Sequence, residues 1–553
     1  QTCALPILSA PAASPIASAT NPPAFQGAEH PTDVRMSCIL AAKSVADAVR
    51  SSLGPRGMDK LIQLKDGSVI ITNDGATILK YMEAAHPASK LMVSMSHAQD
   101  VAAGDGTTSV VIFAGAFLNA CKTLLERKLH PSLISDAIKL VGEKALEIIG
   151  EMKIPFKSEN DFTPEEREIL INSATTSLSS KLTSQWADIL APLAVDAVLR
   201  IHDGKNVDLN DVRVIQKVGG VLDDSELIDG IVFEHKLLRE NSETRTLKNA
   251  KIAMIQFGLS PPKTDMQSQI VLTDYNQMDR VQREQRKYIL HMVQAIAKTG
   301  ANIILLQKSV MREPISDLAL TFLEKKGILV VKDVDRNDVD FVCRTLGCKP
   351  IASIEGLTAD KLGYADLVEE KQTPGGAIVK ITGLKTHSKT VSILLRGSNE
   401  LMIGEAERSL HDALCVIRSL VYERALLPGG GAAEVELAVK LSQYANTVGG
   451  ELGHCIHCIA DSLDIIPYTL AENAGLKPLE VVTKLRELHT KGEKNYGISI
   501  TANGPADMIA EDVLQPFLVT KSAISFASET VRLLMKVDRS EERRVGKECR
   551  SRW

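Results

Sequence analysis

Three short stretches, far apart in the chain, carry the residue types that bind phosphate and metal ions. They are residues 73–77 (NDGAT), residues 104–109 (GDGTTS), and residues 411–414 (HDAL) followed by the glycine run 428–431 (PGGG). Carboxylate oxygens are ligands that Mg²⁺ prefers, and backbone amides and hydroxyls donate hydrogen bonds to phosphate. Together the stretches predict one nucleotide site.

The middle stretch ends where a long apolar run, residues 110–125, begins. This pattern predicts a helix whose first turn carries the amides and hydroxyls of the stretch, and unpaired amides at a helix N-terminus attract phosphate. Asp105 is then free to hold a magnesium ion. The pattern GxxxxGK(S/T) does not occur, and residues 54–57 (GPRG) do not supply it, so an ordinary P-loop ATPase is excluded.

Length and composition predict a soluble protein of two to four domains. The 553 residues exceed what one core accommodates, and 44% of them are hydrophobic. A net charge of -5 with both signs interspersed argues against a nucleic-acid binder, which needs a basic stripe. No uncharged apolar stretch approaches the roughly 20 residues of a membrane span, and no basic residue precedes Arg35 as in a signal peptide. We therefore expect a cytoplasmic protein without nucleic-acid or membrane partners.

The cysteines fit a reducing compartment better than a disulfide framework, because there are nine of them and they are scattered. Cys455 and Cys458 raise the question of a metal site, since residues three apart on a helix can present two thiolates to one ion. A structural zinc site usually needs four ligands, and Cys343 and Cys348 are wrongly spaced to supply a second pair. We expect buried, packing cysteines instead.

Hydrophobic periodicity divides the chain into helical and mixed parts. Residues 1–32 show no periodicity and predict a disordered leader, residues 33–53 a helix, and residues 61–64 and 69–72 the strands of a hairpin. Helix dominates from 76 to 152, with a fully buried portion at 101–128.

Beyond residue 155 helices continue as far as the glycine pair Gly219–Gly220, which we interpret as a hinge. From there to about residue 383, short β-rich runs alternate with helices, which predicts an α/β domain inserted into a helical one. Two of its helices are expected at 274–298, behind an exposed loop, and at 316–327, with Ser316 as the cap. Helices return after 397.

Five motifs occur in order: residues 52–55 (SLGP), 72–77 (TNDGAT), 103–109 (AGDGTTS), 396–398 (RGS) and 428–431 (PGGG). In this order and spacing the chain resembles a group II chaperonin subunit from about residue 33 to about 538. The resemblance implies a multidomain α+β fold with a mainly helical equatorial domain made from both chain ends, a small α/β intermediate domain, and an α/β apical domain with a helical protrusion. The implied boundaries are, in chain order, leader 1–32, equatorial 33–154, intermediate 155–220, apical 221–383 with the protrusion at 258–299, intermediate 384–416, equatorial 417–538 and a non-family tail 539–553.

The resemblance also implies roles for residues in the motifs. Asp74 and Asp412 flank the γ-phosphate of ATP and orient the attacking water, and Asp105 ligates Mg²⁺. The remaining nucleotide-binding positions are Gly54, Pro55, Gly75, Gly104, Gly106, Thr107, Thr108, Ser109, Ser180, Lys181, Gly430, Gly497, Ser499 and Gln515. From pattern alone Lys181 is a surface charge, and any single motif is more often a turn or a cap.

Two positions depart from the family pattern. Gln515 stands where many members carry a carboxylate near the ribose, and Ser499 stands at an adenine-side position that is often Asn or Asp. We therefore predict weaker nucleotide affinity than in subunits with both groups. Residues 1–7 and 539–553 do not resemble the family, and we interpret them as added sequence, the alternative being natural tails.

Four functions remain to be compared. The resemblance implies an ATP-hydrolysing subunit of two stacked eight-membered rings of paralogous subunits, which close over unfolded proteins including actin and tubulin. A ring-scaffold subunit that binds nucleotide with little turnover is the alternative, and Asp74, Asp105 and Asp412 argue against it. A small-molecule phosphotransferase needs an acceptor pocket and a lysine in the cradle, and a standalone peptide-binding module at 220–383 leaves the flanking segments unexplained.

Overall fold

The computed structural model describes residues 31–537 apart from 66, 85, 157–161, 203, 205, 239–245, 262–274, 310–312 and 385–389. Residues 1–30 and the tail 539–553 thus lie outside the described residues, as does most of the predicted loop before residue 274. The first helix, α1 (Pro31–Arg50), already includes the last two residues of the predicted leader.

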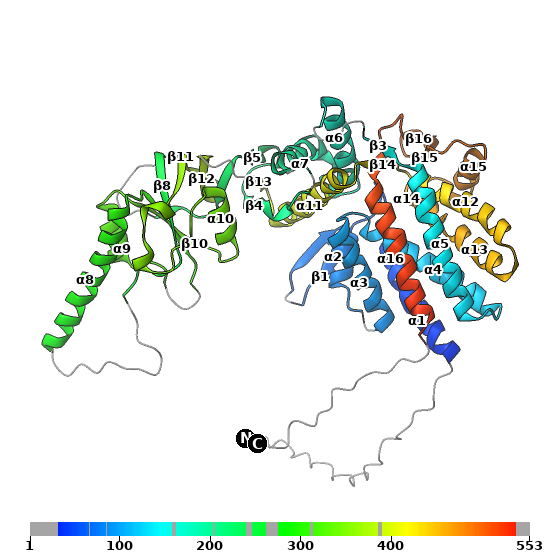
Figure 1. Ribbon diagram of the computed structural model, residues 1–553, viewed down its shortest axis with the longest axis horizontal. Helices are drawn as coiled ribbons and strands as arrows, with labels where there is room; N and C mark the ends of the chain where they lie inside the picture. The colour runs from blue at the N-terminus through cyan, green and yellow to red at the C-terminus, as the bar shows by residue number, and fades with distance from the viewer. Residues whose placement is uncertain are drawn as a thin grey trace, which may run out of the picture.

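The largest unit is helical and is built from both ends of the chain. Figure 1 shows α1 beside α16 (Phe517–Met535), and the guanidinium Nε of Arg35 donates to the carbonyl of Val537 at 2.9 Å. One hydrophobic core joins residues of both halves. The other main helices of this core are α3 (Pro87–Ala102), α4 (Thr107–Glu126), α5 (Pro131–Met152), α12 (Ala432–Val448) and α13 (Gly450–Ser462).

Helix α4 is the apolar run expected to be buried on all sides. The structure begins it at Thr107, because the chain between Ala103 and Gly106 forms a tight loop after α3 rather than a continuous helix from 101. Among the described residues it is also the helix long and apolar enough to cross a membrane, contrary to our expectation from the sequence. Most of that apolar window is buried inside the protein, which is typical of a core helix.

A hairpin projects from this unit, as predicted. Strand β1 (Lys60–Gln63) pairs antiparallel with β2 (Val69–Thr72), with Leu61 opposite Ile71. The side chain of Leu61 is 69% exposed. Among the described residues the sheet has two strands, so its outer edges have no partner strand there.

The middle unit combines a small sheet with three helices. Parallel strands β4 (Val212–Val218) and β13 (Val391–Gly397) lie side by side, and β5 (Glu226–Ile228) pairs with β13 on its other edge. Their core is shared with α6 (Pro164–Ser179), α7 (Ala187–Ile201) and α11 (Glu400–Tyr422). Because β5 still belongs to this sheet, the chain passes to the next sheet after Ile228, beyond the glycine pair interpreted as a hinge.

A seven-stranded mixed sheet forms the far end of the molecule (Figure 1). Its order is β6 (Gly230–Phe233), β12 (Gly376–Leu384), β11 (Gly363–Thr373), β8 (Thr246–Ile255), β9 (Ile303–Gln307), β10 (Leu329–Val334) and β7 (Leu237–Leu238). The hydroxyl of Ser316 caps α9 (Asp317–Glu324) as predicted, and α8 (Tyr275–Thr299) matches the expected amphipathic helix. Together with α10 (Asp338–Leu346), these elements confirm the predicted alternation of strands and helices in this part of the chain.

Several short elements surround the expected site. Helix α2 (Gly75–Tyr81) follows β2, and β14 (Ala425–Pro428) lies between β3 (Ile154–Pro155) and β17 (Leu514–Pro516). The sequence analysis missed β14, where it expected only an interrupted helix. The remaining elements here are α14 (Ile465–Asn473), α15 (Pro478–Thr490), β15 (Tyr496–Ser499) and β16 (Gly504–Asp507).

Candidate functional site

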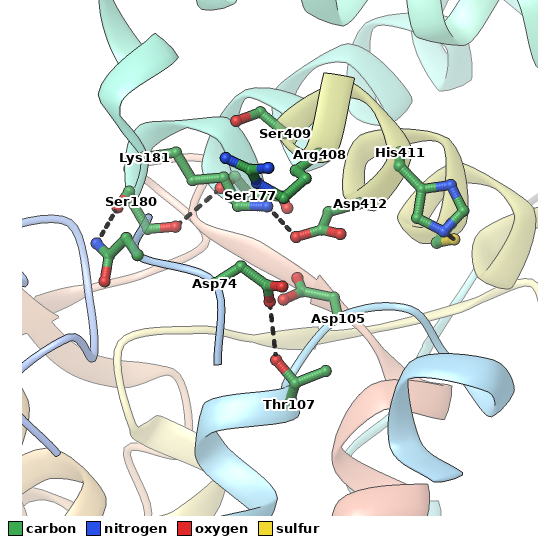
Figure 2. A network of polar contacts seen from close by, with 12 residues as sticks. Asp74, Asp105, Thr107, Ser177, Ser180, Lys181, Arg408, Ser409, His411 and Asp412 are labelled. Atoms are coloured by element: carbon green, nitrogen blue, oxygen red, sulfur yellow. Dashed lines mark hydrogen bonds and ion pairs between the residues drawn. The ribbon is translucent and has the colours of Figure 1, made fainter. Parts of the chain in front are cut away.

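The three motifs meet where α2, α4 and α11 approach one another. Figure 2 shows Asp74, Asp105 and Asp412 gathered on facing elements, although the first and last are separated by more than half the chain. Asp74 precedes α2, Asp105 precedes α4, and Asp412 lies within α11 of the middle unit. The site is therefore formed only when the middle unit rests on the helical unit.

Asp74 is held in place as the N-cap of α2. Its carboxylate accepts from the amide of Ala76 at 3.2 Å, from the amide of Thr77 at 2.9 Å and from the hydroxyl of Thr77 at 2.6 Å. The hydroxyl of Thr107, at the start of α4, donates to it at 3.3 Å. Burial acts to raise the pKa of Asp74, but the charge of Lys181 and the hydrogen bonds from Thr77 and Ala76 outweigh burial and hold that pKa below its usual value.

Lys181 forms an ion pair with Asp412 (Figure 2). The two side chains are 7% and 11% exposed, so Lys181 is buried and the interpretation as a surface charge is wrong. Lys181 comes directly after Ser180, the C-cap of α6. The packing of α6 against α11 brings Lys181 next to Asp412. Burial lowers the pKa of Lys181, and the carboxylates of Asp74 and Asp105 oppose that shift.

The first turn of α4 has the features of a phosphate cradle. Gly106 is its N-cap in a left-handed conformation, with φ 75°, and no side chain caps the helix. The amide of Gly106 donates to Asp105 Oδ1 at 2.6 Å, and Gln99 holds the carbonyl of Asp105 at 2.9 Å. Gly104, also at positive φ, lies against Cys415, where any Cβ would collide with that side chain. The loop therefore presents amides at a helix N-terminus, where an anion is stabilised.

A cavity of about 550 Å³ opens beside this cradle, within the size range of small-molecule sites. It is lined by eight of the predicted residues: Gly54, Pro55, Asp105, Ser109, Ser180, Gly430, Ser499 and Gln515. We call it the nucleotide cavity. Asp74 and Asp412 instead line a neighbouring cavity of about 750 Å³, together with Arg408 and His411.

The other predicted residues support the walls. Gly75 touches the start of α4 at Thr108, and Gly497 lies against the carbonyl of Gly429. Gly430 was expected to admit the nucleotide. It has φ +64°, and a Cβ there would lie 3.0 Å from the amide nitrogen of Ile498 in β15. The close approach of β15 therefore requires glycine at this position independently of any ligand. Gly104, Gly106, Thr107, Thr108 and Lys181 are not among the residues that line the nucleotide cavity.

The two positions that depart from the family pattern are already engaged within the chain. Gln515 donates from Nε2 to the hydroxyl of Thr520 at 2.9 Å. The hydroxyl of Ser499 lies 2.7 Å from that of Thr501 and accepts from the amide of Ala502 at 3.0 Å. Their capacity to bind a nucleotide is thus partly used, which supports the prediction of weaker affinity without testing it.

Sequence reasoning missed several charged groups. Glu434 lines the nucleotide cavity, and Asp100 lies near Asp74, where burial and the charge of Asp74 raise its pKa. The position of Glu434, three residues after the last glycine of the run, was the available signal. Among the described residues no three His, Cys, Asp or Glu are arranged to hold a metal, so Mg²⁺ at Asp105 has to take further ligands from phosphate and water. Cys455 is buried and Cys458 partly buried, as expected of packing residues.

Comparison with known proteins shows the family to which the chain belongs. The model of the TCP-1/cpn60 chaperonin family matches residues 45–540. T-complex protein 1 subunit delta of Takifugu rubripes is 52% identical over 93% of this chain and 95% of its own length, and that of Homo sapiens is 51% identical over 93% and 95%. The delta subunit of Schizosaccharomyces pombe is 50% identical over 94% and 98%.

The comparison also bears on the paralogue. Among eukaryotic group II chaperonins, the stretches 259–266 and 269–290 predict similarity to the delta subunit of the cytosolic complex TRiC (CCT). The relatives above carry that name, which confirms the prediction. With the family model covering most of its length, the chain belongs to the TCP-1/cpn60 chaperonin family.

Proposed function

We propose that this chain is an ATP-hydrolysing chaperonin subunit whose hydrolysis is coupled to the position of its middle unit. The observation that carries the proposal is the placement of Asp412. It lies on α11, in the core of the middle unit, yet faces Asp74 and Asp105 at the first turns of α2 and α4 in the helical unit. Moving α11 away removes one carboxylate from the site, so hydrolysis and closure are coupled.

The residues of the site have different proposed roles in hydrolysis. The amides and hydroxyls at the start of α4 bind the phosphates, and Asp105 holds Mg²⁺, which when bound neutralises phosphate charge. Asp74 and Asp412 orient the attacking water. A carboxylate whose pKa is held low is a weak base, so the lowered pKa of Asp74 favours orientation over proton abstraction.

The proposed partners follow from the family and from two parts of the chain, the β1–β2 hairpin and helix α8. The exposed edges of the β1–β2 hairpin suit pairing with strands of a neighbouring subunit in an eight-membered double ring of paralogues. Helix α8 projects from the far end of the molecule, where a lid segment can close over unfolded clients such as actin and tubulin (Figure 1). The equatorial domain of a subunit of a cytosolic complex is proposed at 33–154 with 417–538, the intermediate domain at 155–220 with 384–416, and the apical domain at 221–383. The pairing of β5 with β13 extends the first intermediate segment to Ile228, and α11 extends the second to Tyr422.

One observation favours the scaffold alternative. In this structure Asp412 is paired with Lys181, so its carboxylate is not free to orient water. A subunit in which this pair persists after nucleotide binds would turn ATP over slowly. The active form therefore requires Lys181 to release Asp412, for which the phosphates of ATP offer a competing anion.

The experiment is to compare rings that carry the wild-type subunit with rings that carry Asp412→Asn. We expect normal sedimentation, unchanged ADP binding and loss of this subunit's share of magnesium-dependent turnover by about 10²-fold or more, since a positioned catalytic group contributes that much. Glu400→Gln removes an exposed carboxylate from the first turn of the same helix and should leave turnover intact. Unchanged turnover in intact Asp412→Asn rings would support the scaffold alternative instead.

A further inference from the structure

Glu434 is a buried acid in the wall of the nucleotide cavity. It is the third residue of α12, after the left-handed N-cap Gly431, and it is 6% exposed. Gly54, Gly430 and Leu470 line the same cavity, so Glu434 lies between the turn at residue 54 and the glycine run. Nothing in the proposed hydrolysis uses it.

The carboxyl group of Glu434 is not fully satisfied by the protein. Its Oε2 is buried and has no hydrogen-bond partner among the described residues. Burial raises the pKa of Glu434 to about 7, and a hydrogen bond with its own backbone opposes this shift. Removing an unpaired carboxylate from water is costly, so the neutral acid is the stable form in such a place.

Charged residues that line the same cavity are Arg56, Asp105, Glu511 and Asp512, an excess of carboxylates. The guanidinium of Arg56 is directed to the carbonyl of Ala474.

The other charges on α12 point elsewhere. Glu436 and Lys440 lie roughly 200° and 240° around the helix from Glu434, at 100° per residue. There Glu436 binds His489 of α15, and Lys440 binds Glu151 of α5. The other charged groups of α12 are therefore engaged away from Glu434.

We propose that Glu434 binds the nucleotide as a neutral carboxylic acid, donating a hydrogen bond from its buried oxygen to an acceptor atom of the nucleotide. This rests on the proposed function, because it assigns a further contact in the same cavity. An ionised Glu434 would repel the phosphates and has no proton to donate. Binding therefore takes up a proton at this residue.

The direction of the pH dependence follows from this. Bound nucleotide raises the pKa of Glu434 above its value in the free protein. The affinity that the hydrogen bond from Glu434 adds is therefore complete below about pH 7. It is lost as the pH rises through the pKa of Glu434 in the bound state. Within that window the dissociation constant rises by at most about tenfold per pH unit. At pH 7 about half of the sites are ionised before binding, so about half a proton is taken up per site.

The test is calorimetric titration of Mg-ADP into rings carrying the full chain, in two buffers of different ionisation enthalpy, from pH 6 to 9. Glu434→Gln keeps a donor but cannot titrate, so it should bind as the wild type does at pH 6, lose about half a proton of uptake at pH 7, and remain tight at pH 9. Glu434→Leu, of similar size without a donor, should bind several-fold more weakly at pH 6.

Equal proton uptake by wild type and Glu434→Gln overturns the proposal, as does wild-type affinity in Glu434→Leu at pH 6. Thermal unfolding of each ring checks that the subunit is folded. Failure of the wild-type site to bind Mg-ADP is a different result, because it refutes the proposed nucleotide function itself.

Discussion

Lys181 lies among carboxylates of three different segments, and its charge lowers the pKa of Asp74. It pairs with Asp412, and the charges of Asp74, Asp105 and Glu405 favour its protonated form. Because the pKa of Asp74 is lowered, the stabilisation from its ionised form is complete above its unfolded value of about 3.9 and is lost as the pH falls through the lower folded value. At neutral pH Asp74 is therefore charged.

Removing this cation should affect both stability and the pH profile. In Lys181→Met, Asp412 is left buried without its partner, a change that typically costs about 3–5 kcal/mol of unfolding free energy. The loss of the lysine charge also removes one of the causes that lower the pKa of Asp74, so that pKa rises and the acid limb of the hydrolysis profile moves to higher pH. Urea unfolding and turnover between pH 4 and 8 measure the two effects.

Lys181→Arg is the matched control, because it keeps the charge and should retain most of the stability and the position of the acid limb. An acid limb that stays in place in Lys181→Met would contradict the assigned role of the lysine charge.

The sequence predicted which residues belong to the site better than it predicted which side chains would lie beside them. The spacing of Asp74 and Asp105 from the following helices indicated their place at helix starts, since a cap and a helix N-terminus are local features. The burial of Lys181 depends on α6 packing against α11, residues more than 200 positions apart, so its neighbours gave no local signal. The same holds for Glu434, whose environment is made by α14 and β15.

Among the elements, the contact between the starts of α2 and α4 holds the two motifs together. Gly75 is the first residue of α2, and a Cβ there would meet Thr108, with the amide nitrogen at 2.8 Å. Its backbone conformation is helical, so alanine adds no backbone strain and the obstacle is purely steric. The absence of a side chain thus allows Asp74 to reach Thr107.

We expect Gly75→Ala to force these helix starts apart. The overpacking should destabilise the chain by about 1–3 kcal/mol and lower turnover, because Asp74 moves away from Thr107. Gly150→Ala in α5 is the control: no atom lies near the added Cβ, so it should stabilise the helix by about 0.5–1 kcal/mol. Chemical denaturation and ATPase assays compare the two, and equal behaviour of both variants would argue against the contact.

Most elements could be predicted from periodicity, with instructive exceptions. The hairpin, α8 and α9 fall close to where the pattern placed them, and the strands β8, β9 and β10 lie in the part of the chain where β-rich runs were expected to alternate with helices. Strand β14 was missed because its four residues are all buried and lie between two helices. A short apolar run of this kind does not distinguish strand from helix until β17 and β3 flank it.

At the scale of the whole molecule, the chain enters and leaves the far unit at neighbouring strands. β6 begins it and β12 ends it, and the two pair antiparallel with Gly230 opposite Thr382. Its two hydrophobic cores, one on each face of the seven-stranded sheet, contain residues of 231–384 alone. The helical unit differs, because its core needs residues from both ends of the chain.

This topology predicts opposite behaviour for two excised segments. Residues 229–384 should fold alone, because the ends are adjacent and excision uncovers little apolar surface, chiefly Val232 and Ile378 where they meet the middle unit. Residues 31–152 should not, because they lack α12, α13 and α16, against which their apolar faces pack. Circular dichroism and urea titration should show a cooperative transition for the first segment and none for the second. If 229–384 unfolds without cooperativity, the far unit depends on the rest of the chain for its stability.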